Sequence, residues 1–317
     1  MISENKSDKI ILDRGLTDVI KFLASVMIAL HHYSQLVLST GVSDNLIYKL
    51  FSTQGGYLGV ALFFFFSGYG VMMSDIKNHF SLVQFFKKRI LKIYKPVILI
   101  TIIWLPVIYM KLGGVNDIIQ ILKDLCWGWK DGVLWYVKVL FILYVLFYIY
   151  TEIRILKPNY RVVYVILFTF LAYFITYKLF PIYCTISVPL FFIGVLLAEY
   201  RDVFYQFFHK WWGYLFGFVV FAAILVIGRG QAMVYHAMFN YILIFIALAF
   251  LSYYSVDISN VPKWMGNFSF DVYLVHNKVL TIYKTCWPVA ELSPWLFLIA
   301  SFIASFIFYR IRLLLKI

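Results

Sequence analysis

Charged residues are scarce in this sequence, and cysteine is almost absent. Asp, Glu, Lys and Arg together make up 14% of the 317 residues, whereas hydrophobic residues make up 63%. Because a soluble globular chain has about 25% charged and 45–50% apolar residues, this composition excludes an ordinary soluble fold. The three cysteines, Cys126, Cys184 and Cys286, lack the C-x-x-C spacing of a metal site. We therefore predict no metal and at most one disulfide.

Features of a multidomain or processed chain are also missing. There is no linker rich in Pro, Gly or Ser, no low-complexity tract and no convincing internal repeat, which would point to a secondary transporter. The first 12 residues are polar and do not resemble a cleaved signal peptide. We expect one membrane domain over residues 1–317, with a polar cytoplasmic tail at 1–12 and no appended soluble domain.

What is present is a series of long apolar windows. Each approaches the length of about 20 residues that a transmembrane helix needs, so we predict an all-α polytopic membrane protein with roughly ten helices. With a cytoplasmic N-terminus, 18 of the 28 Lys and Arg residues lie inside, 7 outside and 3 within the spans. This bias predicts that both termini are cytoplasmic, and it attributes the net charge of +13 to anionic lipid rather than nucleic acid. The predicted spans are 16–38, 56–74, 96–111, 133–151, 160–178, 182–199, 212–228, 233–254, 268–286 and 293–313.

The first span carries polar and ionisable residues on one face. At about 100° per residue, Arg14, Lys21, Ser25 and His32 share nearly the same azimuth. Lys21 and His32 are then separated by about 16 Å along the helix axis. Ionisable residues inside a membrane are costly, so they mark a site, a pathway or a partner. The plainer interpretation is that Lys21 snorkels or pairs with Asp18 while His32 only packs.

The second span and the basic stretch after it offer further chemistry. Residues 63–70 combine phenylalanine with small residues, which either allow close helix packing or expose Ser67 along a groove. Residues 87–95 contain five cations. They form either an interfacial helix on anionic lipid or a site where Lys88, Arg89 and Lys92 hold phosphates.

The fourth and ninth spans carry the remaining candidates. Trp135 and Tyr136 open the fourth span at the outer boundary. They are either belt residues or a flat platform for a sugar ring. In the ninth span Tyr273 and His276 share one helix face, while Asp271 points elsewhere. That face is either a hydrogen-bonded helix contact or a second buried polar site.

The order of these segments resembles the acyltransferase-3 family of bacterial integral membrane O-acyltransferases. The first-span cation is Lys, whereas the family more commonly has Arg at that position. Some relatives also carry an extracytoplasmic esterase-like domain. Because a single membrane domain is predicted here, this chain is expected to be a stand-alone member. Five elements carry the resemblance: the Arg/Lys-x10-His pair at Lys21 and His32, Phe-Phe-x-x-Ser-Gly at 63–68, Lys-Arg-x-x-Lys at 88–92, Leu-Trp-Tyr at 134–136, and Ser-Phe-x-x-Tyr-Leu-x-His at 269–276.

The resemblance implies a multi-pass enzyme of the bacterial cytoplasmic membrane. Its donor is acyl-CoA, usually acetyl-CoA, and it holds no permanently bound cofactor. Its acceptor is a hydroxyl of a capsular, exopolysaccharide or other envelope glycan. In this interpretation His32 is the general base, because an imidazole titrates near neutral pH. Lys21 steers the CoA from the cytoplasmic side.

The remaining roles follow from the same comparison. Trp135 and Tyr136 would bind the sugar. The donor site is expected to contain Arg14, Lys88, Arg89 and Lys92 for the phosphates, and Ser67, Tyr273 and His276 as donors to the thioester oxygen.

Two other classes of function are weighed against this interpretation. The rival function is a transporter or flippase for a lipid-linked sugar, whose intramembrane charges line a pathway. A membrane sensor or scaffold would need an output module, which the sequence lacks.

Overall fold

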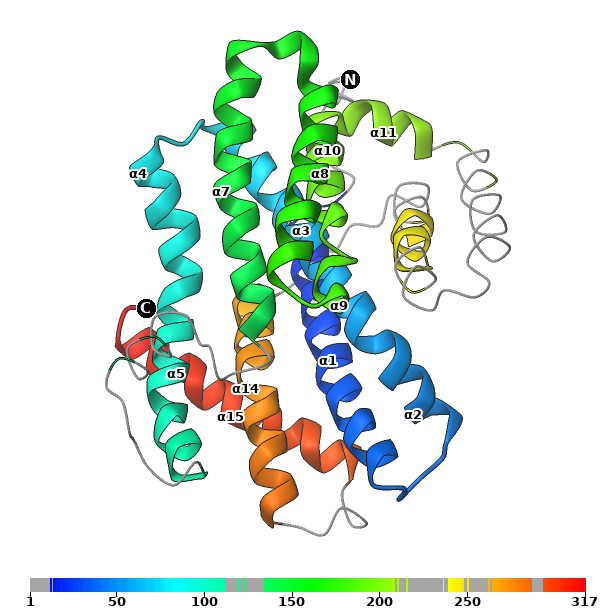
Figure 1. Ribbon diagram of the computed structural model, residues 1–317, viewed down its shortest axis with the longest axis vertical. Coiled ribbons are helices and arrows are strands. Elements are labelled where there is room, and N and C mark those ends of the chain that lie inside the picture. The colour runs from blue at the N-terminus through cyan, green and yellow to red at the C-terminus, as the bar shows by residue number, and fades with distance from the viewer. Residues whose placement is uncertain are drawn as a thin grey trace, which may run out of the picture.

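The computed structural model is all-helical in the part of the chain that it describes (Figure 1). The predicted all-α fold class is therefore confirmed. Cys184 and Cys286 are free thiols, and Cys126 lies outside the described residues. The structure describes residues 12, 14–111, 119, 123, 134–208, 210, 215, 236, 239–247, 250, 262, 264–286 and 293–317.

Long α-helices alternate with short turns of other helical types. The elements η2 and η3 are π-helical turns, and η5 is a 3-10 turn. In chain order the elements are α1 (Arg14–Ser39), α2 (Leu46–Leu50), η2 (Phe51–Gly55), α3 (Gly56–Lys77), α4 (Leu82–Phe85), η3 (Phe86–Ile90), α5 (Leu91–Lys111), α7 (Trp135–Leu156), η5 (Pro158–Tyr160), α8 (Arg161–Leu179), α9 (Ile182–Thr185), α10 (Pro189–Glu199), α11 (Arg201–Phe208), α14 (Trp264–Cys286) and α15 (Pro294–Leu314).

Seven helical segments of the described part are long and apolar enough to cross a membrane. Helix α14 matches the ninth predicted span and has 23 residues, but polar residues such as Asp271 and His276 lower its hydropathy. Most of the predicted spans 212–228 and 233–254 lies outside the described residues. The orientation of the termini stays a prediction. The seven segments are Arg14–Ser39, Leu46–Lys77, Leu82–Val107, Trp135–Leu156, Pro158–Leu179, Ile182–Glu199 and Pro294–Leu314.

The centre of the bundle is formed by α1, α3, α10 and α14 (Figure 1). Glycines let α3 and α10 touch through their backbones. A Cβ added at Gly68 would collide with the carbonyl of Phe191, and one at Gly194 would collide with the carbonyl of Phe65. Small residues in membrane helices commonly serve such close approach. The small residues of the second span therefore include at least one, Gly68, that serves packing rather than an open groove.

Buried ion pairs hold one end of the bundle together. Arg154 of α7 bonds through its two terminal nitrogens to Asp75 of α3 and to Glu199 of α10, each at 2.9 Å. Glu199 also accepts from Arg161 of α8 at 3.1 Å and from the Tyr150 hydroxyl at 2.7 Å. Removing one partner of such a buried pair costs about 3–5 kcal/mol. This network fixes the ends of four helices, and in the predicted topology it marks the cytoplasmic side.

Candidate active site

Cations from three parts of the chain gather around Lys21 of α1. Arg14, Asp18, Arg89 and Lys92 all lie close enough to Lys21 to interact electrostatically with its ammonium. Three of the four cations predicted for the donor site, Arg14, Arg89 and Lys92, are thus brought together around Lys21 by α1, η3 and α5. The exposed Lys88 is different, because its ammonium lies 5.4 Å above the ring of Phe80.

Arg89 is held in place by the end of α3. Its guanidinium donates to the carbonyl of Gly70 at 3.3 Å and to the hydroxyl of Ser74. It also lies 5.7 Å from the centre of the Phe80 ring. Its Nε is buried and has no hydrogen-bond partner among the described residues. The side chain is therefore preorganised and retains one N–H that a ligand can use.

The last helix adds a cation to this region that the sequence pattern did not reveal. Arg312 of α15 donates to a carboxylate oxygen of Asp271 of α14 at 2.8 Å, and it interacts electrostatically with Lys92. Asp271, expected to point elsewhere, is fully buried in this pair. Opposite charges near the same ends of two antiparallel spans were the signal that could have revealed it. We call Arg14, Lys21, Arg89, Lys92 and Arg312 the cation cluster.

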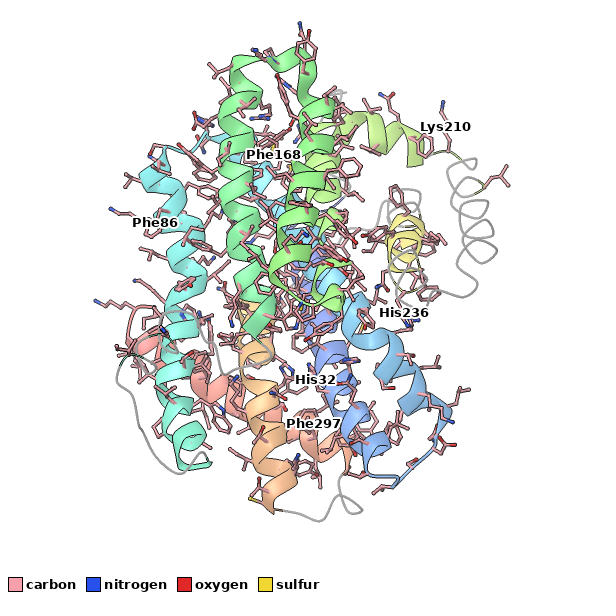
Figure 2. The ribbon with its side chains drawn as sticks, viewed as in Figure 1. His32, Phe86, Phe168, Lys210, His236 and Phe297 are labelled. Carbon is pink, nitrogen blue, oxygen red and sulfur yellow. The ribbon has the colours of Figure 1, made fainter. Side chains whose placement is uncertain are left out.

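Two histidines from distant parts of the sequence meet deeper in the bundle. The ring of His32 in α1, labelled in Figure 2, stacks on the ring of His276 in α14, with centroids 5.4 Å apart and planes inclined by 22°. His276 is fully buried, whereas His32 is half-buried. The Nδ1 of His32 lies 3.3 Å from Oε1 of Gln35. The sequence placed each histidine on a polar face, and the structure brings the two faces together.

The hydrogen bonding of His276 fixes its tautomer. Its Nδ1 lies 3.0 Å from the carbonyl of Val272. A carbonyl only accepts, so Nδ1 carries the proton and the neutral ring keeps a lone pair on Nε2. That Nε2 is buried and has no partner among the described residues. His276 therefore offers an acceptor, whereas the family resemblance implied that it donates to a thioester oxygen.

Hydroxyl groups occupy the space between the cation cluster and the histidines. The hydroxyls of Ser67 and Tyr136 are 3.2 Å apart, and Tyr144 interacts with Ser67 and with Arg89. The ring of Tyr136 lies edge-on to that of Tyr273 at 5.4 Å. Tyr273 in turn lies 6.1 Å from the ring of His276. Side chains able to donate hydrogen bonds thus run from Arg89 to His276, and Tyr144 is a member that the sequence did not reveal.

Trp135 and Tyr136 have different surroundings. Tyr136 is only 2% exposed, and its ring packs against Phe64 with centroids 4.7 Å apart. Its face is therefore closed to a sugar that approaches from outside. Trp135 is half-buried and meets the exposed ring of Tyr183 edge-on at 6.2 Å. Of the two predicted platform residues, Trp135 alone keeps part of its surface accessible.

His31 has a different environment from its neighbour His32. Its Nδ1 donates to the carbonyl of Phe51 in η2 at 3.0 Å. Its ring lies so close to Gly56 that any Cβ there would collide with it. His31 therefore ties the π-turn η2 to α1. This contact gives it a structural role that does not involve the hydroxyl-lined interior.

A family model described as an acyltransferase domain matches residues 17–309. The match covers nearly the whole chain and includes every residue of the candidate site except Arg14 and Arg312. No curated protein and no solved structure gives a significant match.

Proposed function

Because the chain belongs to the acyltransferase-3 family of membrane acyltransferases, we propose that it transfers an acyl group, most simply acetyl, from cytoplasmic acyl-CoA to a hydroxyl of a cell-surface or exported glycan. The cell in question is a bacterium, and the enzyme resides in its cytoplasmic membrane. The observation that carries the proposal is the path of hydroxyl groups from the cation cluster to the stacked pair of His32 and His276.

The cation cluster suits the phosphates of CoA. Its five cations are accompanied by two carboxylates, Asp18 and Asp271, so the site carries excess positive charge. Arg89 and Arg312 offer planar forks that bind phosphate oxygens in pairs, whereas Lys21 and Lys92 act as compact point charges. We assign the pyrophosphate and the 3′-phosphate of the donor to this cluster.

The path of hydroxyl groups suits the arm that carries the thioester. An extended pantetheine arm reaches on the order of 15–20 Å, which matches the separation of about 16 Å between Lys21 and His32 along α1. Ser67, Tyr136 and Tyr273 can donate hydrogen bonds to the thioester oxygen as negative charge develops on it. We assign Nε2 of His276 to accept from an amide N–H of the arm, since a buried N–H needs a partner.

His32 is the residue best placed to act as the base. It is half-buried, so an acceptor can approach it, whereas His276 is enclosed. A hydrogen bond from Nδ1 to Gln35 leaves the lone pair of its neutral ring on Nε2. His32 removes the hydroxyl proton as the oxygen attacks the carbonyl carbon. The C–S bond then breaks, and His32 returns the proton to the sulfur, so that ester and CoA thiol are the products.

A labelling experiment tests the proposal. The purified full chain in lipid nanodiscs is supplied with radiolabelled acetyl-CoA and a neutral glycan, and labelled glycan and free CoA are measured together. We expect both products, and we expect the His32→Ala variant to form neither. If no acetyl-CoA is consumed and the chain instead moves a lipid-linked sugar across the bilayer of sealed proteoliposomes, it is a transporter and the proposal is overturned.

A further inference from the structure

A second polar group lies outside the path that the donor uses. Gln54 of the π-turn η2 contacts His236, with 2.6 Å between the amide Nε2 of Gln54 and the imidazole Nδ1 of His236. The ring of Tyr57 stacks on the ring of His236, with centroids 5.2 Å apart and planes inclined by 13°. His236 precedes the helical stretch 239–247, which is anchored where the hydroxyl of Tyr241 donates to the carbonyl of Ile186.

The amide of Gln54 has unused hydrogen-bonding capacity. One of its polar atoms faces His236, and the other, Oε1, is buried without a partner among the described residues. Turning the amide over would exchange the two atoms, but one of them would still be left unpaired. A buried amide atom without a partner costs free energy. A hydroxyl can both donate and accept, so it is the group that pairs with this amide in either orientation.

The place of this group in the fold connects it to the reacting end of the site. Gln54 and Tyr57 lie at the end of the Leu46–Lys77 segment opposite Asp75, hence on the outer side of the predicted topology. Ring contacts lead from here to the proposed base. Tyr57 lies 6.5 Å from His31, and His31 lies 5.0 Å from His32. Two ring contacts, through His31, therefore connect Tyr57 to His32.

Aromatic surface surrounds the amide. Tyr57 interacts with Tyr183 of α9, and Tyr183 meets Trp135 of α7 edge-on. Tyr57 and Trp135 are half-buried, and Tyr183 is 45% exposed. Partly exposed aromatic faces combined with an uncharged hydrogen-bonding group are typical of sites that bind neutral sugars, because a sugar presents apolar C–H faces together with hydroxyls.

We propose that Gln54 binds the acyl acceptor, through a hydrogen bond between its unpaired amide atom and a hydroxyl of an uncharged pyranose unit. His236 is a positioning residue that holds the amide in orientation, and Tyr57, Tyr183 and Trp135 supply apolar surface for the ring. This inference rests on the proposed acyltransferase function and extends it, since it names the residues that select the acceptor.

Steady-state kinetics of the full chain in nanodiscs test the inference. The acceptors are the methyl glycosides of glucose, galactose and mannose, the donor is acetyl-CoA, and the acetylated glycoside is measured by mass spectrometry. Gln54→Leu should raise the acceptor KM about tenfold relative to the donor KM, as expected for one lost hydrogen bond. His236→Phe should do the same. Thr53→Ala is the matched control, because Thr53 is exposed in the same turn.

A conservative variant separates positioning from mere stability. The Oδ1 of asparagine lies the same number of bonds from Cα as the Nδ1 of histidine, so His236→Asn should return the acceptor KM to within about threefold of the wild-type value. An unchanged acceptor KM in Gln54→Leu overturns the inference. So does an equal rise of the donor and acceptor KM, which would mark a structural role.

Direct binding distinguishes this inference from the proposed function. If the wild-type chain neither consumes nor transfers acetyl groups, the proposed function fails. The same glycosides are then examined by saturation-transfer NMR with wild-type and Gln54→Leu protein. Binding that is lost in Gln54→Leu supports the sugar site, and absence of binding to the wild-type protein overturns it.

Discussion

His32 and His276 stack face to face, yet they differ in what they can do. His276 is enclosed and holds its Nδ1 proton on the carbonyl of Val272, whereas His32 is half-buried beside Gln35. The two imidazoles differ in solvent exposure and in hydrogen-bond partner. This difference suits them to separate roles, His32 as the proposed base and His276 as a hydrogen-bond acceptor for the donor.

The two histidines should respond differently to glutamine. The Oε1 of glutamine can replace Nε2 as an acceptor but cannot serve as a base, so His276→Gln should retain most of the donor affinity while His276→Leu raises the donor KM about tenfold. His32→Gln should lower kcat by at least about 100-fold. Initial rates at varied acetyl-CoA and acceptor measure both effects. A His32→Gln enzyme with nearly normal kcat would remove His32 from the role of base.

His31→Ala should keep substantial activity but lose stability. The variant removes the hydrogen bond to Phe51, which contributes about 0.5–1.5 kcal/mol, and it loosens the contact between η2 and α1. We expect a melting temperature several degrees lower and a kcat within about tenfold of the wild-type value. Thermal unfolding in detergent and the transfer assay measure the two quantities. A His31→Ala protein that is stable but inactive would contradict the assignment of His31 to structure.

Alanine substitutions of Arg89 and Lys88 should have different effects on the donor KM, although the two residues are neighbours. Arg89 is anchored by Gly70 and Ser74 inside the cation cluster, whereas Lys88 is exposed. Arg89→Ala should raise the donor KM about 10-fold to 100-fold, the loss expected for charge-assisted hydrogen bonds, while Lys88→Ala changes it less than threefold. Added salt should weaken donor binding in the wild-type protein by screening. An unchanged donor KM in Arg89→Ala would remove the phosphate role of Arg89 and leave only contact with lipid.

Arg312 should contribute to donor binding although it belongs to the last helix. Arg312→Gln is expected to raise the donor KM about tenfold or more without changing the acceptor KM, because it removes a phosphate ligand. Arg310→Gln, at an exposed position of the same helix, is the control. Since a broken buried pair destabilises the fold, Asp271→Asn/Arg312→Gln provides a second variant that leaves no lone buried charge. A normal donor KM in that folded double variant would exclude Arg312 from the site.

Donor and acceptor should work from opposite sides of the membrane. In sealed proteoliposomes of defined orientation, acetyl-CoA should support transfer only from the side of the N-terminus and a soluble glycan only from the other side. This expectation rests on the positions of the two sites. Arg89 of the cation cluster bonds to Ser74, near one end of the Leu46–Lys77 segment, whereas Gln54 lies near the other end. Equal transfer with both substrates on the N-terminal side would contradict it.

Helix periodicity accounts for what the sequence predicted well. The azimuth shared by Arg14, Lys21 and His32 depends only on residue spacing along one helix, so their common face could be read directly. The ordered motifs predicted the family in the same way, because their order along the chain is a property of the sequence alone. These are local properties, and they do not require knowledge of which helices are neighbours.

Contacts between helices account for what remained hidden. The pairing of Asp271 with Arg312 depends on how α14 packs against α15, and the burial of Tyr136 depends on how α7 packs against α3. The π-turns η2 and η3 add a residue to one helical turn, which shifts the direction of Gln54 and Arg89 relative to any count based on a regular helix. No spacing rule for a single segment contains this information.

The backbone contact between α3 and α10 has a physiological consequence. Where Gly68 and Gly194 let two helices touch without side chains between them, one helix has little freedom to slide past the other. We expect the helices to keep their arrangement through the catalytic cycle while the flexible pantetheine arm of the donor extends toward the acceptor. An acyl group would then cross the hydrocarbon layer without an aqueous opening, so protons and sodium would find no leak and the cell would keep its ion gradients.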